Sequence, residues 1–279
     1  MLKPLAVLAT CVLSLLCAQT ARADSEFTDP IGDASGSPDI AKVRVANDSG
    51  SRVAFRIELA GGATLPPAGD LTILVDADKD DFTGAGSWDY RIVLNGVETW
   101  SYSRWNGDDW ILVPAVTGKA YFLDDAVVFA IDRSELGDTT GFDLFVQSGL
   151  YEDGELIAAD PASDGEGEWT YKTVAKTLGL TATPIVAVTK GGARAGRAFL
   201  VGYTFGRTDS PEPASGAKTT CVATISGQRL AARVNQSGEV AACLATPPRS
   251  AKGKLLRLTL KTIFGNVSIG KVYSTRVRA

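Results

Sequence analysis

The sequence predicts an all-β protein made of two antiparallel β-sandwiches in tandem. Short apolar segments recur along the 279 residues, and turn residues rich in Gly, Pro, Asn and Asp separate them. Several segments alternate apolar and polar side chains with the period of two that is typical of half-buried strands. Between residues 24 and 175, only one turn at 133–136 suggests helix. Short strands at regular spacing with turns between them indicate sandwiches.

Charge divides the chain near residue 175. Residues 24–175 carry 29 acidic and 10 basic side chains, net −19, whereas residues 176–279 carry 3 acidic and 16 basic ones, net +13. Such asymmetry predicts a domain boundary and separate partners. The acidic half repels nucleic acid. The basic half suits an anionic wall polymer, lipid headgroups or its acidic neighbour, although its cations are dispersed and equally fit a solvated face.

Residues 1–23 have the pattern of a secretory signal peptide. Lys3, the apolar run 5–17 and the small residues 21–23 match its three regions. Cys17 offers a lipoprotein alternative, but the bulky Leu16 precedes it. No later segment reaches the length of a membrane span, so we expect a secreted protein, extracellular or held at the cell surface by binding.

The segments expected as strands follow one another closely in the acidic half. The turn residues Asn47-Asp-Ser-Gly50 and Asn95-Gly96 predict two hairpins. The expected strands are 40–46, 53–59, 71–75, 90–94, 97–104, 110–113, 120–123, 126–132, 142–148 and 169–171. These place an acidic, jelly-roll-like sandwich at 24–175, and residues 177–184 are expected to cross over to the next domain.

The basic half, 176–279, repeats the strand pattern around two cysteines. Expected strands are 198–207, 219–225, 240–245, 255–262 and 267–277. Cys221 and Cys243, the two cysteines outside the signal, predict one disulfide in an oxidising compartment. About a hundred residues with short strands and a disulfide favour an immunoglobulin-like sandwich, although the Trp often packed on such a disulfide is missing.

The chain has no His, and Met1 is its only Met. This composition excludes His-based general bases, His-ligated zinc and His or Met ligation of haem. A pair of carboxylates could in principle hydrolyse a glycoside, but no placed pair is visible. We therefore expect a protein that is not an enzyme and uses neither haem nor zinc.

The loop between the apolar segment 71–75 and the strand at 90–94 is strongly acidic. Its carboxylates are Asp76, Asp78, Asp80, Asp81 and Asp89. Oxygen ligands at i, i+2 and i+4, with glycines that let the backbone curl, suit calcium, whereas the helix-flanked calcium loop does not fit. Asp33 and Asp39, near Asp29, are expected to approach the same end of the sandwich and complete a calcium site. The alternative is a solvated acidic loop.

Aromatic residues gather just after this loop. The candidate ligand-binding residues are Trp88, Trp100, Tyr102, Arg104, Trp105 and Trp110. Flat aromatic faces with neighbouring polar groups are what a glycan-binding surface needs. Strand alternation puts Trp100, Tyr102 and Arg104 on one face and Trp105 on the other, so at least one Trp is expected in the core.

Several short motifs resemble DOMON-like sandwiches, which include family-nine carbohydrate-binding modules. They are Asp29-Pro-x-Gly-Asp33, Pro38-Asp-Ile40, Val75-Asp-Ala-Asp78, Thr83-Gly84, Asp89-Tyr90 and Ile131-Asp-Arg-Ser-Glu-Leu136, within residues 27–172. The resemblance implies a β-sandwich that binds sugar, with structural calcium, or haem; the missing His and Met disfavour haem. Residues 178–279 resemble Ig-like modules of bacterial secreted proteins.

Together these features predict a secreted, non-catalytic binding protein. Its expected partner is a glycan or cell-wall polymer, and calcium is expected to hold the site rigid without touching the ligand. The alternative is a surface structural or adhesion protein that binds another protein or an anionic wall polymer.

Overall fold

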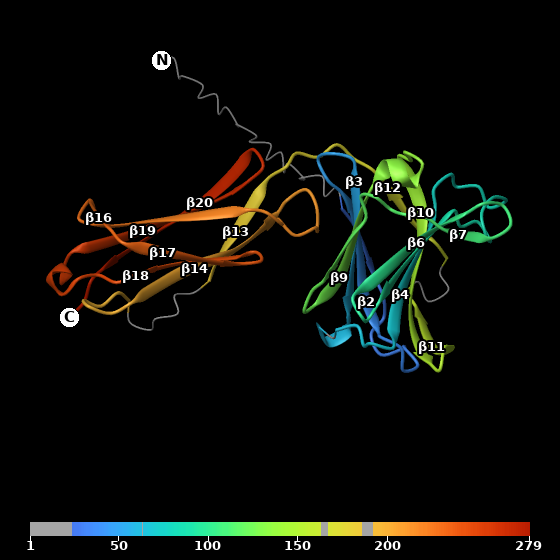
Figure 1. Ribbon diagram of the computed structural model, residues 1–279, viewed down its shortest axis with the longest axis horizontal. Coiled ribbons are helices and arrows are strands. Elements are labelled where there is room, and N and C mark those ends of the chain that lie inside the picture. The colour runs from blue at the N-terminus through green and yellow to red at the C-terminus, as the bar shows by residue number, and fades with distance from the viewer. Residues whose placement is uncertain (1–23, 63, 163–166, 186–191) are drawn as a thin grey trace, which may run out of the picture.

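The computed structural model describes residues 24–62, 64–162, 167–185 and 192–279. The expected all-β fold is confirmed: the described chain forms four antiparallel sheets, which pack in pairs around two hydrophobic cores (Figure 1). The expected signal, residues 1–23, lies outside the described residues. No helix in the described ranges combines the length and apolar character needed to cross a membrane.

The first sandwich packs a five-stranded sheet on a seven-stranded one. The five-stranded sheet has the order β1-β2-β3-β9-β8, with bounds Asp24–Thr28, Ile40–Asn47, Arg52–Leu59, Ala126–Asp132 and Lys119–Phe122. The other sheet has the order β11-β10-β4-β5-β6-β7, with β12 also on β10. Its bounds are Glu155–Pro161, Gly141–Glu152, Gly69–Asp76, Tyr90–Asn95, Thr99–Trp105, Trp110–Leu112 and Trp169–Lys172, and short 3₁₀ turns occupy Ala60–Gly62 (η1) and Arg133–Leu136 (η2).

Alternation explains the core between these sheets. Along β5, Tyr90, Ile92 and Leu94 are buried while their neighbours are half-buried, so one face of the strand supplies the core. The same period of two holds in β4 and β10. The Asn95-Gly96 turn forms as expected, and only glycine fits at 96 because an added Cβ would lie 1.7 Å from the Pro66 carbonyl oxygen.

The second sandwich pairs two four-stranded sheets. One has the order β13-β14-β18-β17, with bounds Leu180–Ile185, Phe199–Arg207, Val240–Ala245 and Ala232–Ser237; the other has the order β16-β15-β19-β20, with bounds Gln228–Leu230, Lys218–Ile225, Leu255–Phe264 and Val267–Arg276. A short 3₁₀ turn, η3, covers Arg249–Ala251.

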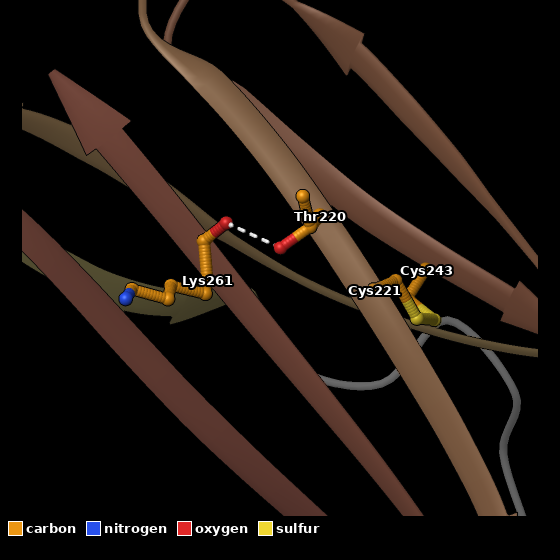
Figure 2. Close-up of a disulfide and its surroundings, with 4 residues drawn as sticks. All are labelled: Thr220, Cys221, Cys243 and Lys261. Carbon is orange, nitrogen blue, oxygen red and sulfur yellow. Dashed lines mark hydrogen bonds between the residues drawn. A yellow bond between two sulfur atoms is a disulfide. The ribbon is translucent and has the colours of Figure 1, made fainter.

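The predicted disulfide is confirmed and joins the two sheets of this sandwich. Cys221 of β15 bonds to Cys243 of β18, with 5.9 Å between their Cα atoms (Figure 2). Buried hydroxyl groups add a second connection, since Tyr203 of β14 and Thr262 of β19 hydrogen-bond at 2.8 Å. Without the Trp that often packs on such a disulfide, these residues tie the sheets together from inside the core.

Five strands were not expected, and two of them, β16 and β17, are short strands of the second domain. Residues 180–185 form β13, paired with β14, where a crossover was expected. Residues 155–161 form β11, paired with β10, where no strand was expected. Residues 24–28 form an extra edge strand, β1, on β2. These segments are short and polar or lie at sheet edges, so the hydrophobic pattern leaves them unmarked.

A buried ionic cluster connects the two domains. Arg207 of β14 contacts Asp209 at 2.9 Å, Asp48 at 3.1 Å and Glu212 at 3.4 Å, and Asp48 belongs to the β2–β3 turn of the first domain. Glu212 also contacts Arg52 at 3.2 Å. Side-chain exposures of 8% for Arg207, 0% for Asp209 and 6% for Glu212 place this cluster away from water.

The segment between the domains is held as well. The buried Lys176 ammonium contacts Asp24 and donates to the Asp209 carbonyl oxygen at 2.8 Å. Tyr121 donates its hydroxyl to Glu212 at 2.8 Å. Residues of both domains and of the segment between them thus share one set of ion pairs and hydrogen bonds.

Candidate metal centre and aromatic surface

The acidic loop lies at one end of the first sandwich. β4 ends at Asp76, β5 begins at Tyr90, and the loop between them turns back so that the Asp89 N–H donates to the Val75 carbonyl at 3.0 Å. Gly84 has φ +72, and a Cβ there would lie 2.5 Å from the Trp88 carbonyl oxygen, so the turn requires glycine. The loop curls at its glycines as expected.

Three of its carboxylates converge on one point. Asp76, Asp78 and Asp89 each offer an oxygen atom, and these atoms lie within 4.8 Å of one another. Asp76 is 1% exposed, and its Oδ2 is buried without a hydrogen-bond partner in the described part of the chain. A buried carboxylate oxygen beside two other carboxylates is a costly arrangement that a cation would relieve.

Backbone N–H groups fix the orientation of these side chains. Lys79 N donates to Asp76 Oδ1 at 2.6 Å, Asp80 N to Asp78 Oδ1 at 3.0 Å, and Ala77 N to Asp89 Oδ2 at 2.9 Å. The loop thus holds three carboxylates in place through its own backbone. Such pre-organisation suits the binding of a hard cation by oxygen ligands.

The electrostatics agree with an ion site. Burial raises the pKa of Asp76 to about 6; the Lys79 N–H opposes this, and the negative charges of Asp89 and Asp78 add to it. Burial also raises the pKa of Asp89, against the N–H of Ala77 and with the charge of Asp78. Bound cations reverse such shifts because they favour the ionised carboxylates.

A second triad shares Asp76. Oxygen atoms of Asp76, Asp143 and Glu168 also lie within 4.8 Å of one another, and Asp143 is the β10 residue opposite Asp76. Asp143, however, already pairs with Lys79 at 2.7 Å. This triad therefore carries less uncompensated negative charge than Asp76, Asp78 and Asp89 do.

Two expected ligands of the acidic loop need correction. Asp80 and Asp81 are exposed and belong to none of the acidic groups found among the described residues. Asp80 instead accepts the Phe82 N–H at 3.0 Å and stabilises the turn. The i, i+2, i+4 spacing fails at its third position because the chain has already turned away from the sheet there.

Asp33 and Asp39 also depart from the expectation. Asp33 groups with Asp29 and Asp160, and Asp39 accepts the Gly32 N–H at 2.8 Å. β10 pairs with both strands that carry these groups: its Ser148 lies opposite Asp160 of β11, and its Asp143 lies opposite Asp76 of β4. Ser148 and Asp143 are five positions apart, or about 17 Å along the strand. The two acidic groups are therefore separate, and Asp33 and Asp39 do not complete the Asp76 site.

An open pocket of about 250 Å³ adjoins the Asp76 group. Asp78 and Asp89 form part of its wall, and the remaining lining residues are Ala77, Tyr90, Arg104, Trp105, Leu136 and Gly137. The pocket thus combines an aromatic face, a guanidinium group and two carboxylates of the candidate metal centre, where the ends of β4 and β6 meet η2. We call it the Trp105 pocket.

An aromatic surface extends from this pocket over the outer face of the seven-stranded sheet. Trp105 and Trp110 are paired neighbours on β6 and β7 and pack edge to face, with ring centroids 5.6 Å apart. The Arg91 guanidinium lies 4.9 Å from the centre of the Trp110 ring. Trp88 packs on Phe145 of β10, with ring centroids 6.2 Å apart. In Figure 1, β6, β7 and β10, which carry Trp105, Trp110 and Phe145, lie on the right.

The structure buries one expected ligand residue and packs a second one against the core. Tyr102 is 3% exposed, stacks on Tyr90 and donates its hydroxyl to the Glu135 carbonyl. Trp100 is partly buried and packs edge-on against the core residue Phe129, with ring centroids 5.2 Å apart. Gly118 closes over it so tightly that a Cβ would lie 2.6 Å from the ring. The remaining edge of Trp100 lines a shallow pocket of about 450 Å³ bordered by Leu112 and residues 113–115.

Sequence reasoning missed Arg91, Tyr90 and Asp143 at this site. The sequence does contain a signal for Arg91. It is a polar residue of the alternating strand β5, and its side chain lies on the same face of the sheet as Trp105. Asp143 and Glu168 join the Asp76 region only through the pairing of β10 with β4 and β12, which no local pattern reveals.

Comparisons with known proteins identify no family for this chain. No protein-family model matches the chain, and no curated protein matches it. Among solved structures, a chimeric titin Z1Z2 functionalized with a KLER exogenous peptide from decorin matches with 8% identity and a TM-score of 0.28, over 87% of this chain and 98% of that one. A similarity at this level carries no argument about function.

Proposed function

We propose that the protein is a secreted, non-catalytic glycan-binding protein whose first domain holds a calcium ion at Asp76, Asp78 and Asp89. The observation that carries the proposal is the Trp105 pocket, where an aromatic ring, Arg104 and two of these carboxylates meet. Aromatic rings cover the apolar face of a sugar, and the charged groups take its hydroxyls. Calcium suits three carboxylates because it prefers oxygen ligands.

The outer aromatic surface supports the same proposal. Trp105, Trp110 and Trp88 are half-buried, so each presents part of its ring to solvent. Partly exposed aromatic groups that cluster on one sheet face can mark a ligand-binding surface. The resemblance of residues 27–172 to DOMON-like and family-nine carbohydrate-binding modules agrees with a sugar ligand.

The test is retention of the protein on immobilised polysaccharides, in affinity electrophoresis through gels that contain mannan, xylan or soluble cellulose derivatives, with calcium present. We expect retention on at least one polymer and its loss in Trp105→Ala or Trp110→Ala. Tyr273→Phe, a substitution in the second domain, serves as the folded control and should keep retention. Equal retention of the tryptophan variants and the unmodified protein would refute the proposal, and so would a lack of retention on every polymer.

A second candidate function is adhesion of the basic domain to an anionic polymer. Of its three acidic residues, Asp209 and Glu212 are buried and Glu239 accepts the Ala214 N–H at 3.0 Å. Its accessible charge is therefore almost entirely positive in the described residues. Exposed cations gather around η3 at Arg249, Lys252 and Lys254. If the basic domain is the adhesive part, charge reversal at these three positions should abolish retention of the protein on heparin or polyuronate. If glycan binding by the first domain is the function, the same charge reversal should leave retention of the protein unchanged.

A further inference from the structure

The metal centre and the Trp105 pocket share a wall. Asp78 and Asp89 belong to both, whereas Asp76 lies beneath them and is 1% exposed. An ion held by the three carboxylates therefore has protein on the Asp76 side and the pocket on the other. A metal site that merely braced a loop would need no such opening.

The protein supplies only part of a calcium coordination sphere here. One oxygen from each of Asp76, Asp78 and Asp89 gives three ligands, and Asp143 and Glu168, which group with Asp76, would bring the number to five, whereas calcium takes about six to eight. Asp80 and Asp81, the nearest further carboxylates of the loop, are exposed and lie outside the group. Because Asp78 and Asp89 also line the Trp105 pocket, oxygen atoms of water or of a ligand in that pocket can reach an ion held by these carboxylates.

The charge of the pocket selects the kind of ligand. The negative charges of Asp76, Asp78 and Asp89 are balanced by a divalent cation together with Arg104, and Asp143, Glu168 and Lys79 beside Asp76 add a net negative charge, so the loaded site has no excess of positive charge. Such a site gives an anionic ligand no Coulombic advantage. Trp105 and Tyr90 offer flat surfaces beside the ion, which suit the apolar face of a sugar ring.

We infer that the calcium ion binds the glycan directly, and that two adjacent hydroxyl groups of a neutral sugar replace water on the ion while its ring packs on Trp105. This inference rests on the proposed glycan-binding function and goes beyond it, because calcium becomes part of the ligand site. Glycan binding is then calcium-dependent even in protein that stays fully folded without calcium.

The test uses europium(III) in place of calcium, together with soluble oligosaccharides of mannan, xylan and cellulose. Luminescence lifetimes in H₂O and D₂O count the water molecules on the ion. A sugar that binds through two hydroxyl groups should remove about two of them. Oligosaccharide affinity, measured by titration calorimetry, should fall about tenfold or more when calcium is exchanged for a chelator.

Matched variants separate the coordination from the fold. Asp78→Asn should lose both europium binding and calcium-dependent sugar binding, whereas Asp80→Asn, a change in the same loop outside the group, should keep both. Trp105→Ala should keep europium and lose the sugar. Circular dichroism with and without chelator checks that the first domain stays folded.

Two results would overturn the inference in distinguishable ways. An oligosaccharide that binds equally with calcium and with chelator, and leaves the europium hydration number unchanged, would separate the ion from the ligand while glycan binding itself stands. Absence of binding by all three oligosaccharides in calcium would remove the proposed function and this inference together.

Discussion

Replacement of Arg207 by Met should destabilise the protein by about 3–5 kcal/mol, the usual cost of removing one partner from a buried ion pair. Arg207 is 8% exposed and contacts three carboxylates, of which Asp209 is fully buried. Met fills a similar volume but leaves these carboxylates close together without their shared cation. Arg52 and the Ser49 N–H still compensate Glu212 and Asp209, which keeps the cost within that range.

Thermal unfolding followed by calorimetry measures this effect. For a chain of this size each kcal/mol shifts the midpoint by about 2–4 °C, so a decrease of about 6 °C or more is expected in the transition that separates the domains. Arg257→Met, a change at an exposed position of the same domain, is the control and should stay within about 0.5 kcal/mol of the unmodified protein. If Arg207→Met behaved like Arg257→Met, the ionic cluster would not be what couples the domains.

Three further predictions concern stability. Burial acts to raise the pKa of Asp209, but the hydrogen bonds and charge of Arg207 outweigh it and hold that pKa below its ordinary value. The stability contributed by Asp209 is therefore complete above about pH 4 and is lost as the pH falls further. Asp209→Asn should flatten this part of the profile of unfolding free energy against pH, measured by urea titrations. The double substitution Cys221→Ala and Cys243→Ala removes a cross-link between residues 22 positions apart, worth about 3 kcal/mol in the chain-entropy model, and calorimetry should show the loss in the second domain alone. Trp100→Ala should cost more stability than Trp110→Ala, because the partly buried Trp100 ring packs against the core and Trp110 lies on the outer face; similar losses in urea unfolding would mean that the two rings contribute equally.

The strand pattern of the first domain could be predicted from the sequence because most of its strands are half-buried. Alternation placed Trp100 and Tyr102 on one face and Trp105 on the other, and strand pairing agrees. Alternation alone does not say which face is the core. That depends on the pairing of β6 with Ile92 and Leu94, so Tyr102 was assigned to ligand binding although it is buried.

The grouping of carboxylates was predictable only within one loop. Asp76, Asp78 and Asp89 flank a single connection between neighbouring strands, so they had to lie close together. One of the two partners of Asp33, Asp160, comes from β11, which the sequence did not reveal as a strand. The domain interface was equally hidden, since Asp48 and Arg207 are 159 positions apart. One signal was available: the basic half has three acidic residues, and two of them lie at 209 and 212.

Calcium binding at Asp76 is the central claim, and thermal unfolding with calcium or with chelator tests it most directly. At a hundred times its dissociation constant, an ion that binds only the folded state adds about 2.7 kcal/mol. We therefore expect the midpoint to rise by several degrees in calcium. Asp76→Asn should abolish this rise and Asp80→Asn should preserve it. No rise in the unmodified protein, or an equal rise in Asp76→Asn, would contradict the assignment of this loop as a metal centre.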